Sequence, residues 1–318
     1  MAGRQTDVKL PLSACGEGDI GGEVQMPAIT TQTPEEIARL QAKILELKKK
    51  LKAVIVAHNY QRPEVQDIAD FVGDSLELSR KAKEVVDANE IIFCGVHFMA
   101  ETAAILNPTR PVLLAEGTAG CPMADMIDAA DLREWKEKYP RAGVVCYINT
   151  TAAVKAECDI CCTSANAVGH YVSTKTKKKM ILYPGFCITH KRLQAEQVRQ
   201  AKEAHPEAVV LIHPECAPEV VALGDAVLST SQMIRFAKES PAQSFLIGTE
   251  EGLLHRLKLE NPTKTFYLMC NALVCPNMKR TTLDRVLKTM EEQRNRIIIP
   301  EDVRLKALRT VERMLAVV

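Results

Sequence analysis

Short apolar runs that end in polar residues recur along the chain, with helical stretches between them. The first run, 54–57, ends at His58-Asn59-Tyr60, and a helix is expected to begin near Pro63. Runs of this kind show no alternation of apolar and polar residues, which is typical of strands buried on both faces of a parallel sheet. We therefore expect an α/β fold.

The same pattern occurs three times. In each copy an apolar run leads to a polar residue, and a hydroxyl residue follows 17 positions later: His58 to Ser75, Tyr147 to Ser164, and His213 to Thr230. About twenty residues further on, each copy reaches another apolar run with a glycine, at Gly95, Gly185 and Gly248. Three copies of a β-α-β-α-β unit predict parallel strands joined by right-handed crossovers.

These repeats predict three similar α/β domains with parallel sheets around a pseudo-threefold axis and an active site at the centre. The expected segments are a flexible tail at 1–32, α/β repeats at 33–125, 126–205 and 206–283, and a C-terminal closing helix at 284–318. Thr33 and Glu36 have the spacing of a capping box, so a helix should begin there. The tail contains glycines 16, 18 and 21 in dinucleotide-fingerprint spacing, but no expected strand precedes them, so we reject that interpretation.

Charge and composition exclude several kinds of partner. The 318 residues carry a formal net charge of +1, which argues against nucleic acid. No apolar run approaches the roughly 20 residues of a membrane-spanning helix, and the N-terminus lacks a signal-peptide core. We therefore expect a cytoplasmic protein without a membrane partner. In that reducing compartment the 11 cysteines should be metal ligands, redox-active or core residues.

Three cysteines stand at the ends of separate apolar runs. Cys121 and Cys275 are each followed by proline, and Cys187 follows an expected strand at 180–183 that stops at Pro184. Ligands bind at the carboxyl ends of strands in open α/β sheets. A free cysteine is often an inert core residue, but one such cysteine in each repeat predicts a converging site.

Thiolates at these positions favour an iron–sulfur cluster. Their spacings (121 to 187, and 187 to 275) do not suit a zinc finger, whose ligands come in close pairs. Three thiolates on a [4Fe–4S] cube leave one iron open, and an open iron acts as a Lewis acid. Cysteines that lie within or beside expected strands are interpreted as core: Cys94, Cys146, Cys158, Cys161, Cys162 and Cys216.

Polar residues at the same run ends suit an anionic substrate. Hydroxyls and free backbone N–H groups at helix starts bind carboxylate or phosphate, and histidine, tyrosine and glutamate move protons. One histidine at a strand end is often structural, but equivalent positions in three repeats favour a shared site. The hydroxyl candidates are Ser75, Ser164, Thr230 and Ser231, and the proton-transfer candidates are His58, Tyr60, His190, His213 and Glu215.

Taken together, these motifs resemble the quinolinate synthase family over about residues 33–310. The matching segments are Ala57-His-Asn-Tyr60, Gly73-Asp-Ser75, Gly120-Cys121, Tyr147-Ile-Asn-Thr150, Thr163-Ser164, Pro184-Gly-Phe-Cys-Ile-Thr-His190, His213-Pro-Glu215, Ser229-Thr-Ser231 and Cys275-Pro-Asn-Met278. The resemblance implies condensation of iminoaspartate with dihydroxyacetone phosphate to quinolinate, with loss of phosphate and water, in de novo NAD biosynthesis. It also implies three α/β domains meeting at one oxygen-sensitive [4Fe–4S] cluster per chain.

The resemblance further assigns roles to individual residues. It implies Cys121, Cys187 and Cys275 as cluster ligands, and Tyr60, Glu215 and His213 as acid–base residues. The implied substrate-binding positions are His58, Ser75, Tyr147, Asn149, Ser164, His190, His213, Glu215, Thr230 and Ser231. Some family members carry Cys-x-x-Cys-x-x-Cys at the third ligand, but this chain has Cys270 five residues before Cys275, which puts disulfide control there in doubt. A functional link to L-aspartate oxidase or aspartate dehydrogenase is also implied.

Two other functions fit the same cysteines. An iron–sulfur hydro-lyase acting on a small hydroxy acid would use the same open iron. An electron-transfer or iron-sensing protein would need a fourth protein ligand, and no fourth cysteine has an equivalent position in the repeats.

Overall fold

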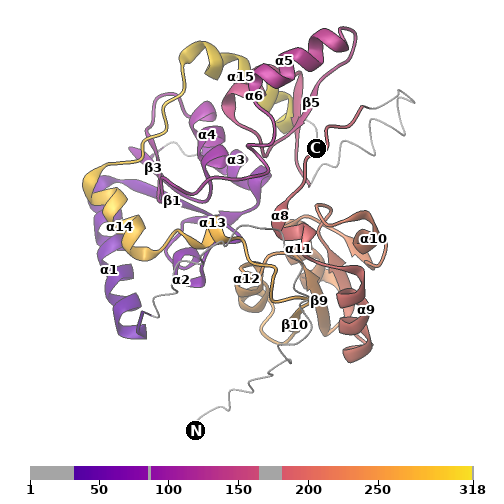
Figure 1. Ribbon diagram of the computed structural model, residues 1–318. Coiled ribbons are helices and arrows are strands. Elements are labelled where there is room, and N and C mark those ends of the chain that lie inside the picture. The colour runs from indigo at the N-terminus through magenta and orange to yellow at the C-terminus, as the bar shows by residue number, and fades with distance from the viewer. Residues whose placement is uncertain (1–31, 85–86, 165–180, 317–318) are drawn as a thin grey trace.

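The computed structural model describes residues 32–84, 87–164 and 181–316, and in this part the chain is a mixed α/β protein with parallel sheets (Figure 1). The first sheet has the order β2-β1-β3-β4 and the third the order β8-β7-β9-β10, so equivalent strands occupy equivalent positions. The second sheet, which comes between these two along the chain, consists of β5 and β6. The strands are β1 (Ala53–His58), β2 (Phe71–Gly73), β3 (Glu90–Cys94), β4 (Val112–Leu114), β5 (Val145–Tyr147), β6 (Ile160–Cys162), β7 (Val209–Ile212), β8 (Ala226–Val227), β9 (Ser244–Gly248) and β10 (Thr265–Leu268).

Helices connect these strands. They are α1 (Pro34–Leu51), α2 (Pro63–Gln66), α3 (Ser75–Glu84), α4 (His97–Leu106), α5 (Ala129–Lys138), α6 (Ala152–Ala156), α8 (Ile188–Lys191), α9 (Ala195–Ala204), α10 (Pro218–Val221), α11 (Thr230–Glu239), α12 (Leu253–Glu260), α13 (Pro276–Lys279), α14 (Leu283–Glu292) and α15 (Glu301–Ala316). The predicted capping box is confirmed, since Thr33 and Glu36 each bond the other's backbone N–H. Among the described residues, no helix combines the length and the apolar character that crossing a membrane requires.

One hydrogen-bond pattern recurs at the start of all three sheets. An aspartate accepts the backbone N–H of the residue 15 positions earlier, which lies in or directly before the first strand: Asp70 from Ile55 at 2.8 Å, Asp159 from Val144 at 2.7 Å, and Asp225 from Val210 at 2.8 Å. In each case the aspartate's own N–H returns to the carbonyl of the same strand residue. Buried backbone groups need hydrogen-bond partners. These two hydrogen bonds therefore hold the aspartate against the first strand in the same way in each copy.

The core follows the apolar runs. All five residues of β3 and of β9 are buried, as the lack of alternation predicts for strands covered on both faces. The segment Ile160–Cys162 forms β6, with Cys161 fully buried, which confirms its interpretation as a core strand. The buried positions of Cys94, Cys146 and Cys216 likewise agree with packing roles.

Two expectations are corrected, and two lie outside the described residues. A strand is expected at 180–183, but residues 181–183 do not form one, because no neighbouring strand pairs with them. Their side chains are exposed. The single closing helix is instead two helices: α14 packs on α1, and α15 packs on α6 and β6. The tail at 1–31, with its glycines, and the part of the second repeat at 165–180 are not described.

Candidate active site

Candidate side chains gather where parallel strands end and where α8 begins. Tyr60 lies just after β1, Tyr147 ends β5, Glu215 follows β7, and His190 belongs to α8. These elements come from three different sheets or their connections, and direct polar contacts join them. The strand ends therefore meet at a common centre, as expected for ligand sites in parallel α/β proteins.

A continuous line of polar atoms runs from Tyr60 to Glu215. The Tyr60 hydroxyl lies 3.3 Å from His190 Nε2 and 2.6 Å from Thr249 Oγ1, which is itself 2.9 Å from His190 Nε2. On the other side of the ring, His190 Nδ1 lies 2.8 Å from Glu215 Oε2. The imidazole of His190 thus connects a phenol with a carboxylate.

Further aromatic side chains surround this line. Tyr147 donates its hydroxyl hydrogen to Glu215 Oε1 at 2.6 Å. The His213 ring stacks on His190 with ring centres 4.4 Å apart and an angle of 10° between the planes. The rings of His58 and Tyr60 form a T-shaped contact, with their centres 4.5 Å apart. All three imidazoles are buried, so their charge states depend on neighbouring groups.

The resting protonation states follow from burial and these contacts. Burial opposes a charge on His190, but the Cys187 thiol and the Glu215 carboxylate outweigh it and raise the pKa of the imidazole to about 10. Burial also disfavours a charged Glu215, yet His190 and His213 hold the pKa of its carboxyl well below the usual range. Burial lowers the pKa of both His58 and His213 to about 3. At neutral pH one imidazolium–carboxylate pair therefore lies beside two neutral imidazoles.

A cavity of about 630 Å³ opens beside the polar line. Tyr147, Ser164, Cys187 and Glu215 are among the residues that line it. Lys191 also faces it and supplies a positive charge, with its Nζ 3.9 Å from the centre of the Phe186 ring. The volume is within the range of small-molecule sites, and the lining offers a cation, hydroxyls and a carboxylate.

The three predicted ligand cysteines share one local structure. Each begins a helical turn in which the N–H four residues later donates to the cysteine carbonyl: Asp125 to Cys121 at 3.2 Å, Lys191 to Cys187 at 3.0 Å, and Lys279 to Cys275 at 3.2 Å. Cys187 and Cys275 directly precede α8 and α13. Cys121 lines a cavity of about 220 Å³. This arrangement points backbone N–H groups back at each sulfur.

These thiols fit a metal centre chemically. Burial raises the pKa of Cys121 to about 12 and also raises the pKa of Cys187 and Cys275, while backbone N–H groups beside each sulfur act in the opposite direction. N–H donors to sulfur are the groups that tune iron–sulfur sites. The donor atoms of Cys187, His190 and Glu215 lie within 4.8 Å of one another. Cys187 thus belongs to a possible metal-binding group at the polar centre.

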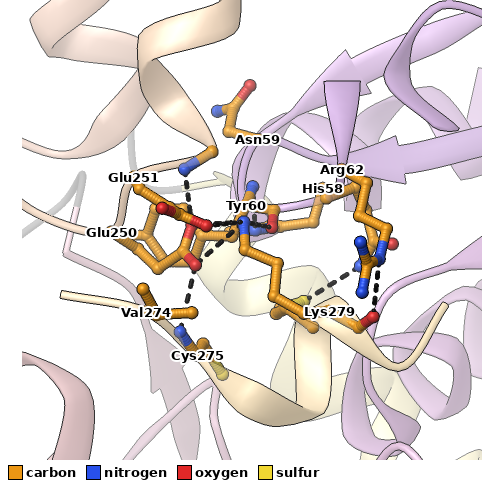
Figure 2. Close-up of polar contacts among 12 residues, drawn as sticks. His58, Asn59, Tyr60, Arg62, Glu250, Glu251, Val274, Cys275 and Lys279 are labelled. Atoms are coloured by element: carbon orange, nitrogen blue, oxygen red, sulfur yellow. Dashed lines mark hydrogen bonds and ion pairs between the residues drawn. The ribbon is translucent and has the colours of Figure 1, made fainter. Parts of the chain in front are cut away.

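A buried ion pair between Lys279 and Glu250 joins two loops of the site, and Figure 2 shows its contacts. Lys279 Nζ lies 3.0 Å from a carboxylate oxygen of Glu250 and donates to the Tyr60 carbonyl at 2.9 Å. The same carboxylate accepts the backbone N–H of Cys275 at 3.0 Å and that of Gly252 at 2.8 Å. Glu250 is fully buried. One ion pair thus connects the loop after β1 with the loop after β9 and a candidate metal ligand.

The remaining predicted residues occupy different surroundings. Ser164 lines the large cavity, and Asn149 contacts Met123 of the cavity lining at 3.6 Å. The hydroxyl of Thr230 accepts a hydrogen bond from Asn59 at 2.8 Å. Ser231 donates to Glu77 of α3 and accepts the backbone N–H of Asp74. Ser75 begins α3 and lines a separate space of about 10 Å³. Apart from Ser164, these hydroxyls are away from the large cavity.

Sequence reasoning missed four residues of the site, one of which is Lys191 in the lining of the large cavity. Thr249 and Glu250 directly follow Gly248 at the end of β9, so the rule applied to the other strand ends would have found them. Lys279 had no comparable signal, because its partner Tyr60 is 219 residues away in the chain.

Comparison with known proteins identifies the family of this chain. The family described as "Quinolinate synthetase A protein" matches residues 42–169 and 167–316. The quinolinate synthase of Dehalococcoides mccartyi is 52% identical over 295 residues, covering 87% of this chain and 97% of the relative. That of Thermodesulfovibrio yellowstonii is 51% identical over 302 residues (89% and 99%), and that of Methanoregula boonei is 49% identical over 301 residues (89% and 99%). This chain belongs to the quinolinate synthase family.

Proposed function

We propose that this protein is a quinolinate synthase that condenses iminoaspartate with dihydroxyacetone phosphate, releasing phosphate and water, in de novo NAD biosynthesis. The observation that carries the proposal is the Tyr60–His190–Glu215 line beside Cys187 and a cavity of about 630 Å³, in a chain of this family. The family match gives no support to the hydro-lyase alternative.

Cys121, Cys187 and Cys275 would hold one [4Fe–4S] cluster per chain. When bound, the cluster would supply an iron without a protein ligand, a Lewis acid for carboxylate or hydroxyl oxygen. The support lies in the shared turn and the backbone N–H groups beside each sulfur. His190 is engaged by Thr249 and Glu215, which favours a role toward substrate and protons over one as a ligand.

Proton transfer is the task that fits Tyr60 and Glu215. Burial raises the pKa of Tyr60 well above 10, so its hydroxyl keeps a proton that it can donate to a leaving hydroxyl group. His190 can replace that proton from Nε2, while Glu215 at Nδ1 compensates the charge of the ring. While His190 is charged, Glu215 and His213 hold protons weakly; once His190 gives up its proton, both become better proton acceptors because its charge no longer lowers their pKa. Tyr147 holds the other oxygen of Glu215 in place, and His213 stacks on His190.

Substrate recognition would use the charges and hydroxyls around the cavity. Lys191 and Ser164 are suited to the phosphate of the triose or to a carboxylate. We propose His58, Tyr147, Asn149, His190 and Glu215 as further contacts within the same centre. Thr230 and Ser231 would contribute only after their present hydrogen bonds with Asn59, Asp74 and Glu77 rearrange. Ser75 would contribute from the start of α3.

We also propose the larger arrangement: three similar domains, at 33–125, 126–205 and 206–283, around a pseudo-threefold axis. The support is the equal strand order of the first and third sheets and the aspartate that recurs at the start of all three. Residues 1–32 would be a tail and 284–318 would close the bundle. The enzyme would act in the cytoplasm, downstream of an enzyme such as L-aspartate oxidase or aspartate dehydrogenase that supplies iminoaspartate.

The test is a product assay on anaerobically purified protein. Iminoaspartate generated in situ and dihydroxyacetone phosphate are supplied, and quinolinate and phosphate are measured by mass spectrometry and a colour reaction. We expect both products in equal amounts, and neither from a Cys187→Ala variant. Dehydration of a hydroxy acid without quinolinate would instead establish the hydro-lyase.

A further inference from the structure

A buried lysine outside the candidate active site lacks a carboxylate partner. Lys155 of α6 is fully buried, and no carboxylate of the described residues forms an ion pair with it. Its ammonium donates to the Thr150 carbonyl and lies 5.5 Å from the centre of the Phe98 ring. A buried ammonium needs an anion or loses its proton.

Three thiols surround this ammonium. Cys146 of β5 and Cys161 of β6 are paired in register, with their sulfur atoms 3.3 Å apart. Cys158 lies two residues after α6, where its single thiol hydrogen can be donated either to the Val154 carbonyl, at 3.1 Å, or to Cys146. Burial disfavours the charged form of Lys155, while the charges of Cys161 and Cys146 favour it. The acidic groups nearest to this lysine are therefore mainly thiols.

Among these thiols, Cys146 is the one suited to be the anion. Hydrogen bonds from the Cys158 and Cys161 thiols lower its pKa well below 9, burial acts against them, and the charge of Lys155 lowers the pKa further. The pKa values of Cys158 and Cys161 shift upward, first because of Cys146. One thiolate with two thiol donors and an ammonium is the microenvironment of a reactive cysteine.

We propose that Cys146 and Cys161 form a redox-active pair that a hydroperoxide converts to a reversible disulfide, with Lys155 as the counter-ion of the attacking thiolate. This pair is separate from Cys121, Cys187 and Cys275, and the proposal does not depend on the proposed function. Cys146 keeps 7% exposure whereas Cys161 has none, so Cys146 is the thiol that a small oxidant reaches first.

The reaction balances with hydrogen peroxide as the oxidant. The Cys146 sulfur attacks one peroxide oxygen, an S–O bond forms, the O–O bond breaks, and hydroxide leaves and becomes water by taking a proton. The Cys161 sulfur then attacks the sulfenic sulfur, the S–S bond forms, the S–O bond breaks, and a second water leaves with the thiol proton. Two sulfurs are oxidised and one peroxide is reduced to two waters.

The crosslink would be reversible, and its position is relevant to the site. The thiolate of a reductant such as dithiothreitol attacks the disulfide and releases both cysteines as thiols. The next residue after Cys146 is Tyr147, and the residues after Cys161 are Cys162, Thr163 and Ser164, all of which line the large cavity. The crosslink would thus fix β5 to β6 at their approach to the cavity.

Peptide mapping tests the proposal on the anaerobic full-length protein. After peroxide treatment and blocking of free thiols under denaturing conditions, trypsin cuts after Lys155 and separates Cys146 from Cys158, Cys161 and Cys162. We expect a crosslinked pair of these two peptides that dithiothreitol releases. It should be absent from Cys161→Ser and from Cys146→Ser, and present in the matched controls Cys158→Ser and Cys162→Ser.

The lysine has its own test. Lys155→Met should slow crosslinking about tenfold for each unit by which the pKa of Cys146 rises, and Lys155→Arg should retain the rate. Because Lys155→Met removes the trypsin site, this variant is mapped with chymotrypsin, which cuts after Tyr147. A crosslink that persists in Cys161→Ser, or no crosslink in the unmodified chain, would overturn the pair. An unchanged rate in a folded Lys155→Met protein would overturn the role of the lysine.

Discussion

The ion pair behind the candidate metal ligand predicts a large effect of one substitution, Lys279→Met. Methionine fills a similar volume but leaves the fully buried Glu250 carboxylate without its ammonium, and the Tyr60 carbonyl without a donor. Removing one partner of a buried ion pair costs about 3–5 kcal/mol. Glu250 keeps the N–H groups of Cys275 and Gly252, so we expect the lower end, about 3 kcal/mol.

The assay is thermal and urea unfolding of the anaerobic protein, followed by circular dichroism, with iron content measured in parallel. We expect the midpoint temperature of unfolding to fall by roughly 5 °C or more. We also expect loss of iron, because the Glu250 contact that orients Cys275 is disturbed. The double variant Glu250→Gln/Lys279→Met should recover part of the stability, since no buried charge remains, but the single amide oxygen can accept only one of the two N–H groups, which bind different carboxylate oxygens.

A surface ion pair supplies the matched control. Lys288 and Glu292 lie 3.8 Å apart with more than half of the lysine side chain exposed, at 55%. Exposed pairs contribute little to stability, so Lys288→Met should behave like the unmodified chain. If Lys279→Met matched Lys288→Met in stability and iron content, the reasoning about the buried pair would be refuted.

Three further sets of substitutions test the site. Replacing Cys121, Cys187 or Cys275 singly with Ala should abolish the brown colour and the iron of anaerobic protein, whereas Cys162→Ala should retain both; the reverse pattern would sink the ligand assignment. Glu215→Gln should keep the iron and KM but lose kcat, as expected when an interaction matters in the transition state; an unchanged kcat would exclude proton transfer by this residue. Thr249→Val removes the hydroxyl between Tyr60 and His190 and should lower kcat about tenfold, the size of one hydrogen bond to a charged group; steady-state kinetics with iron quantified would detect it, and no change would remove Thr249 from the site.

Repetition made much of the fold predictable. The spacing of 17 residues corresponds to real geometry: β1 ends at His58 and α3 begins at Ser75, while β7 ends one residue before His213 and α11 begins at Thr230. The strand expected before Cys187 failed because an apolar run predicts a strand only where a neighbouring strand can pair with it. Residues 181–183 have no such neighbour in the described structure.

The candidate site was predictable where it follows strand ends and unpredictable where it depends on distant contacts. Tyr60, Glu215 and His190 were found from position and from the family resemblance, and the structure brings them into contact. At Ser231 the hydroxyl rule could not foresee the hydrogen bond that this side chain donates to Glu77 of another repeat. Lys279 could not be predicted for the same reason: its place on a short helix does not indicate that the Glu250 carboxylate lies beside it in the folded chain.

The central claim is that a [4Fe–4S] cluster on three cysteines presents one iron without a protein ligand beside the Tyr60–His190–Glu215 line. Mössbauer spectroscopy of protein enriched in iron-57, recorded with and without quinolinate, tests it most directly. The account predicts that one iron in four changes its signal while three do not, and that His190→Ala keeps all the iron but weakens this change. Four unchanged irons on ligand addition, or loss of the cluster in His190→Ala, would contradict it.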